Sequence, residues 1–121
     1  MDAVHPRPKF PTSLGQGFIV LSSLVIMVSF TVRMRFADED RQAISDILGK
    51  LAEASRREPG CVSYVPHWVE GDPTTVVIYE QYKDDASLDA HRATQHFQQY
   101  AVGGLYQMMR ERAVENLTAV I

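Results

Sequence analysis

The chain has very little cysteine and no excess of basic residues. Cys61 is the only cysteine among 121 residues, so no intrachain disulfide can form, and a reducing, cytoplasmic compartment is expected. Lys and Arg number 12 against 15 Asp and Glu, which gives a formal net charge of −3. Because non-specific nucleic-acid binding needs a basic face, no nucleic-acid partner is expected.

Sequence motifs that bind phosphates, metals or nucleotide cofactors, or that carry a catalytic serine, are also missing. The sequence has no phosphate-cradling Gly-rich loop, no G-x-S-x-G nucleophile elbow, no Cys/His zinc spacing and no flavin or nicotinamide fingerprint. We therefore expect no bound cofactor and no metal. Any reaction would then depend on side chains and on the electrons of the substrate itself.

The apolar stretch at residues 18–28 is too short to span a membrane. It has fewer than the roughly 18 to 20 apolar residues that a spanning helix needs, and no small-x-small cleavage site follows it. We therefore predict no membrane association, and an extended arm over residues 1–23 before a domain at 24–121. The arm would pack on a partner subunit or on its own domain; alternatively, Met27 is the natural start.

The spacing of apolar residues predicts alternating strands and helices. Residues 25–36 alternate with a period of two, which is typical of a half-buried strand. Ile44, Ile47, Leu48 and Leu51 mark one face of a helix that begins after an acidic cap and ends before Pro59-Gly60. Further strands are expected at 61–69, 74–82 and 113–121, with a helical region over 83–109 that restarts near Thr94 and breaks or bends at Gly103-Gly104.

This β-α-β-β-α-β order predicts an α+β, ferredoxin-like fold with an antiparallel sheet and both helices on one face. Right-handed crossovers place the first and third strands in the centre. Pro66 cannot donate to a strand ladder, which puts the second strand at an edge. The face without helices must be covered, and a symmetric homodimer that packs sheet against sheet would cover it.

Three short motifs resemble one family. They are Glu58-Pro59-Gly60, Tyr79-Glu80-x-Tyr82-x-Asp84 and Ala90-His91-x-x-Thr94-x-His96-Phe97. Together they are similar to the antibiotic biosynthesis monooxygenase (ABM) superfamily of dimeric α+β barrels, over about residues 25–121. Many members have Trp where Tyr82 stands and Pro where Gln95 stands. Haem-degrading relatives use an Asn on the first strand, where this chain offers Ser29 and Thr31.

The resemblance implies a homodimer or higher homo-oligomer with a small cavity in each subunit, between the helices and the sheet. Within the superfamily, one group oxygenates quinol-type aromatics without metal or flavin, using dioxygen. Another isomerises a phosphorylated autoinducer-2 signal, and its motifs are also similar to those of this chain.

Three titratable residues are candidates for catalysis. His96 comes first, since a neutral imidazole could take a proton from a phenol or from an enol-forming carbon. His91 is five residues away, a spacing that on a continuous helix makes the two histidines a poor chelating pair for a metal, although a break near Thr94 would change the angle between them. Glu80 ends a central strand, and apolar neighbours would raise its pKa if it faced the cavity. A purely structural role is the alternative for each of them.

Four aromatic residues are candidates for binding a flat substrate. Tyr64 and Trp68 share a face of the second strand, while Tyr82 and Phe97 flank the motif histidines. Core or interface packing is the alternative. The sequence thus predicts a cofactor-independent monooxygenase acting on a small electron-rich aromatic such as a quinol. The other hypotheses are an isomerase of a small phosphorylated carbonyl compound and a non-enzymatic dimeric ligand-binding module.

Overall fold

The computed structural model describes residues 26–121, and the predicted arm at 1–23 lies outside the described residues. The elements are β1 (Val28–Arg35), η2 (Asp38–Asp40), α2 (Arg41–Ser55), β2 (Cys61–Trp68), β3 (Thr75–Tyr82), α3 (Asp85–Arg92), η3 (Phe97–Leu105), α4 (Tyr106–Met108) and β4 (Glu111–Leu117). Within this described part, no helix has the length and apolarity to cross a bilayer.

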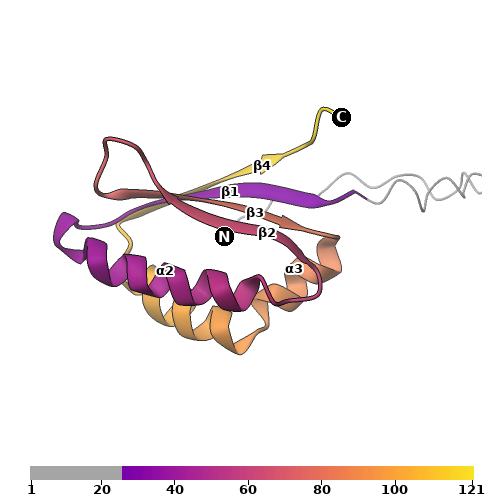
Figure 1. Cartoon of the computed structure of the whole chain (residues 1–121), viewed down its shortest axis with the longest axis horizontal. Helices are drawn as coiled ribbons and strands as arrows, with labels where there is room; N and C mark the ends of the chain where they lie inside the picture. The colour runs from indigo at the N-terminus through magenta and orange to yellow at the C-terminus, as the bar shows by residue number, and fades with distance from the viewer. Residues whose placement is uncertain (1–25) are drawn as a thin grey trace, which may run out of the picture.

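The four strands form one antiparallel sheet in the order β2-β3-β1-β4. This confirms the ferredoxin-like prediction, with β1 and β3 in the centre and the Pro66-containing β2 at an edge. The helices all lie on one side of the sheet (Figure 1). Because a strand exposes alternate residues on opposite faces, this arrangement fixes which side chains meet the helices.

The core lies between the sheet and α2. Val28, Phe30, Val32 and Met34 of β1 face the helices and are buried, as the period of two predicts. Ile44, Leu48 and Leu51 of α2 pack against them. Burying a side chain of this kind stabilises the fold by about 1.5–3 kcal/mol, and this packing is what holds α2 flat against the sheet.

The second helical region is divided into three parts, and the first break lies where Thr94 predicts it. The Thr94 hydroxyl donates to the carbonyl of His91 and accepts from the amide of Phe97, so it caps both sides of the break. The helical region does not break at Gly103-Gly104, so that part of the prediction was wrong, and a bend there stays a prediction. Both glycines lie inside η3, a π-helix, where Gly104 packs on Ile47 of α2.

The last strand begins and ends earlier than residues 113–121. It runs over Glu111–Leu117 because Glu111 pairs with Arg35 and Leu117 with Ser29, so the ladder ends where β1 begins. On the face away from the helices, Val77 and Tyr79 of β3 are only half-buried. No helix among the described residues covers that face (Figure 1).

Candidate active site

A small cavity of about 30 Å³ lies between the sheet and the helices. Its aromatic lining comes from Phe30, Tyr64, Phe97 and Tyr106, and its polar lining from Glu80, His91, Arg92 and Arg112. The cavity therefore combines apolar walls with acid, base and cationic groups. Among the residues selected from sequence, Glu80, His91, Tyr64 and Phe97 line it.

The other three selected residues do not line this cavity. Tyr82 is fully buried, and it contacts two residues of the lining, Glu80 through a hydrogen bond and His91 through its ring. His96 lies behind His91, with its ring centroid 6.2 Å from the His91 ring centroid. Trp68 packs against α2 instead, where its Nε1 donates to Ser45 at 3.0 Å and the Arg41 guanidinium lies 4.1 Å from the ring centroid.

Glu80 is a buried carboxyl on a central strand. It lies opposite Phe30 of β1 and Tyr64 of β2, so aromatic residues flank it on both sides. Burial raises the pKa of Glu80 to about 7, against the lowering effects of the Tyr82 hydroxyl and of Arg92 and Arg112. That hydroxyl donates to Glu80 Oε1 at 2.7 Å. Glu80 can therefore change protonation state near neutral pH.

His91 lies between two carboxyl groups. Its Nδ1 is 2.8 Å from Glu58 Oε2, and its Nε2 is 3.9 Å from Glu80 Oε1. The side chain is 2% exposed, and burial lowers its pKa more than the Glu58 carboxylate raises it. The imidazole is therefore neutral at neutral pH, and one of its nitrogens carries a free lone pair.

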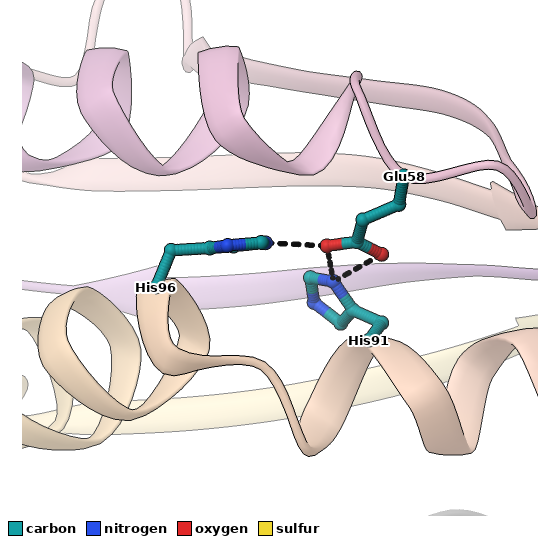
Figure 2. Close-up of side chains that lie close together, drawn as sticks. All are labelled: Glu58, His91 and His96. Atoms are coloured by element: carbon teal, nitrogen blue, oxygen red, sulfur yellow. Dashed lines mark hydrogen bonds and ion pairs between the residues drawn. The ribbon is translucent and has the colours of Figure 1, made fainter.

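Glu58 joins the two histidines. It follows α2 in the turn before β2, and its Oε2 contacts His91 Nδ1 at 2.8 Å and His96 Nε2 at 2.5 Å (Figure 2). The break at Thr94 turns His96 back toward His91, so both rings reach the same carboxylate. On an unbroken helix they would point in different directions.

These three side chains are also the one group among residues 26–121 whose ligand atoms, all within 4.8 Å, could surround a metal ion. Around a tetrahedral metal with bonds of about 2.0–2.1 Å, ligand atoms lie about 3.3 Å apart. The separations of 2.5 and 2.8 Å in this group are instead those of hydrogen bonds. These contacts are therefore hydrogen bonds, and the absence of a metal stays a prediction.

Cys61 does not add a nucleophile to this site. Burial, together with the carboxyl groups of Glu58 and Glu80, raises the pKa of its thiol to about 11. The thiol is therefore protonated at neutral pH, as expected for a structural cysteine.

Sequence reasoning missed the roles of Glu58, Arg92 and Arg112. Glu58 entered the sequence analysis only through the Glu58-Pro59-Gly60 motif, with no role of its own, and it lies 33 residues before His91 in the chain. Its proximity to two motif histidines requires the crossover that brings the end of α2 beside α3. The presence of Glu58 in a motif of the resembled family was the signal that could have found it.

Comparison with known proteins places this site in a family. The model of the family described as antibiotic biosynthesis monooxygenase matches residues 27–102, more than half of the chain. The chain belongs to this family. Its match includes Glu58, Glu80, His91 and His96, so the cluster around the cavity lies within the family domain and not in an added segment.

Individual proteins are similar to this chain at low identity. Probable quinol monooxygenase YgiN of Escherichia coli K12 is 28% identical over 85 residues, which cover 64% of this chain and 82% of YgiN. The crystal structure of PA3566 from Pseudomonas aeruginosa has a TM-score of 0.72 at 25% identity and covers 79% of this chain and 96% of PA3566. The structure of Rv0793 from Mycobacterium tuberculosis has a TM-score of 0.69 at 26% identity and covers 78% of this chain and 96% of Rv0793.

Proposed function

We propose that this ABM-family chain is a cofactor-independent monooxygenase that oxidises a small electron-rich aromatic, such as a quinol, with dioxygen. The observation that carries the proposal is the placement of a neutral His91 and a titratable Glu80 on the wall of an aromatic-lined cavity. The similarity to the protein named probable quinol monooxygenase YgiN supports the choice of substrate class.

The chemistry begins with removal of a phenolic proton. His91 Nε2 accepts this proton, and Glu80, 3.9 Å away, stabilises the imidazolium that forms. The cationic groups of Arg92 and Arg112 line the same cavity and stabilise the phenolate. The phenolate then gives an electron to dioxygen, and the two radicals combine at a ring carbon. Loss of water leaves one oxygen atom in the quinone product.

The cavity must widen before an aromatic ring can enter. A cavity of about 150 Å³ holds benzene, whereas this one measures about 30 Å³. Phe97 is the side chain best placed to move, since it is only half-buried, begins the π-helix η3 and meets both His91 and Tyr106 edge to face.

Phe97→Ala is therefore expected to lower KM for naphthoquinols severalfold while costing about 1–3 kcal/mol of stability, less than a fully buried Phe would. Steady-state oxygen uptake and urea unfolding measure the two effects. Phe30→Leu, which changes the opposite wall of the cavity, serves as the comparison. An unchanged or raised KM in Phe97→Ala would show that Phe97 does not limit entry.

A second function has one specific observation in its favour. Arg92 and Arg112 place two guanidinium groups in the cavity beside Glu80, an arrangement that suits a small phosphorylated carbonyl compound. Such an isomerase would use His91 and Glu80 to move a proton and would need no oxygen. Turnover of a phosphorylated keto compound under anaerobic conditions, without quinol oxidation in air, would replace the first proposal with this one. Ligand binding without turnover of either class would support a binding module.

We also propose that the chain forms a homodimer through the uncovered face of the sheet. Val77 and Tyr79 are half-buried apolar residues on that face. Val77→Asp is therefore expected to convert a dimer into monomers in sedimentation equilibrium, because a carboxylate would be buried without a partner. Glu53→Gln, on the exposed side of α2, should leave the dimer intact. A wild-type protein that sediments as a monomer would contradict this interface.

A further inference from the structure

We propose that Glu58 is a positioning residue that holds His91 in the Nδ1–H tautomer, and that His96 acts through Glu58 rather than on the substrate. The catalytic consequence rests on the proposed oxygenase function. The tautomer and the contacts that fix it do not depend on any substrate.

The hydrogen bonds determine where the proton of His91 lies. An ionised carboxylate accepts hydrogen bonds and cannot donate them. Both oxygens of Glu58 lie near His91 Nδ1, at 2.8 and 3.1 Å, so Nδ1 is the donor. A neutral imidazole has only one N–H, which leaves the lone pair on Nε2. That nitrogen faces Glu80 and the cavity, where a base is needed.

His96 restrains the carboxylate from the opposite side. Its Nε2 lies 2.5 Å from Glu58 Oε2, the same oxygen that accepts the shorter bond from His91. The side chain of His96 is 21% exposed and does not line the cavity, whereas that of His91 is 2% exposed and does. A base must reach the substrate, so this geometry gives His96 the supporting role.

The backbone around Glu58 is held as closely as its side chain. A Cβ on Gly60 would lie 2.2 Å from Ser87 Oγ, so the turn from Glu58 to Gly60 packs directly on α3. The amide of Lys83 also donates to the carbonyl of Gly60 at 2.9 Å. The turn that carries Glu58 is thus fixed against the helix that carries His91.

Several charged or titratable groups surround His91. They are Glu58 in the turn after α2, Tyr64 on β2, Glu80 and Tyr82 on β3, Arg92 on α3, His96 before η3 and Arg112 on β4 beside Glu80. Of these, Glu58 raises the pKa of His91, whereas His96 and Arg92 lower it. The Glu58 carboxylate also raises the pKa of Glu80. Loss of that carboxylate therefore lowers the pKa of His91 and of Glu80. The pH profile of any activity that depends on these groups then moves to lower pH.

The tautomer can be measured directly, with no substrate. Two-bond ¹H–¹⁵N correlation spectra of the ¹⁵N-labelled protein near pH 8 are expected to show His91 protonated at Nδ1. In Glu58→Gln, whose amide can also donate, that preference is lost. His91 protonated at Nε2 in the wild-type protein, or an unchanged tautomer in the variant, would overturn the proposal. The wild-type measurement holds even if the variant does not fold.

Kinetics test the catalytic consequence. With a naphthoquinol and oxygen uptake as the readout, Glu58→Gln should lower kcat by about 10²- to 10⁴-fold, as loss of an orienting carboxylate does, with KM within about twofold. The acid limb of kcat/KM should move to lower pH, and Glu58→Asp should restore part of the rate. A purely structural role would not produce the shift in pH.

Two further variants make the kinetic result specific. Glu53→Gln, a matched change at an exposed glutamate in α2, should leave kcat unchanged. Loss of an orienting partner costs about 10- to 100-fold, and His96→Gln should lie at the lower end, near tenfold, because glutamine keeps a donor for Glu58. A loss in His96→Gln as large as that in His91→Gln would make His96 the base and overturn its supporting role. If no variant and no wild-type protein oxidises a quinol, the proposed function fails, while the tautomer measurement still decides this inference.

Discussion

Replacement of His91 by glutamine is expected to lower kcat for quinol oxidation by about 10²- to 10⁴-fold, the usual contribution of general acid–base catalysis. Glutamine can still donate a hydrogen bond to Glu58, but it has no nitrogen that accepts a proton at neutral pH. Because the change occurs at the reacting proton, KM should change much less than kcat. Steady-state oxygen uptake at saturating quinol measures the effect.

The comparison with other residues makes this prediction specific. His91 is buried, so part of any loss could come from unfolding, and the thermal midpoint of each variant is measured alongside its activity. Glu53→Gln serves as the active control. Activity of His91→Gln within threefold of the wild-type protein, with the fold intact, would remove His91 from the mechanism.

Glu80→Gln is expected to abolish a large pH dependence of stability. The pKa of Glu80 rises from 4.5 to about 7 in the folded protein. Between these values Glu80 therefore binds more protons in the folded state than in the unfolded state, and its contribution to wild-type stability falls as the pH rises from about 4.5 to about 7. Above pH 7 this shift lowers the free energy of unfolding by about 3 kcal/mol. Glutamine at this position stays neutral and can still accept the hydrogen bond from Tyr82.

Urea unfolding at pH 5 and pH 8, at one fixed protein concentration, measures this effect. From pH 5 to pH 8 the free energy of unfolding of the wild-type protein should fall by about 2–3 kcal/mol relative to that of Glu80→Gln. Tyr82→Phe removes the hydroxyl that lowers the pKa of Glu80, so this pKa should rise further. The fall in the free energy of unfolding from pH 5 to pH 8 should then be larger than in the wild-type protein. Parallel pH curves for wild-type protein and Glu80→Gln would show that Glu80 is not protonated in the folded state near neutral pH.

The fold was largely predictable because it depends on local patterns. The alternation along β1 and the apolar face of α2 select the buried side of each element, and Pro66 selects the edge strand. The end of β4 was not predictable, since it depends on where β1 begins and not on residues 118–121 themselves. The two glycines of η3 were misleading for a similar reason, because packing on Ile47 outweighs their tendency to break a helix.

The candidate site was predictable only in part. The sequence identified Glu80 and both histidines, and it predicted that a cavity position would raise the pKa of Glu80. It ranked His96 above His91, because nothing in the local sequence shows which imidazole faces the cavity. That distinction depends on the break at Thr94 and on Glu58, which lies 33 residues before His91. Contacts over such separations come from tertiary packing.

If His91, oriented by Glu58, removes a proton from a substrate that then reacts with dioxygen without a cofactor, metal-free protein should take up oxygen with a naphthoquinol. We expect the wild-type protein to consume one dioxygen per quinol, with no effect of a chelator, and His91→Gln to lose at least about 10²-fold in rate. Uptake that requires added metal, or that persists in His91→Gln, would contradict this mechanism.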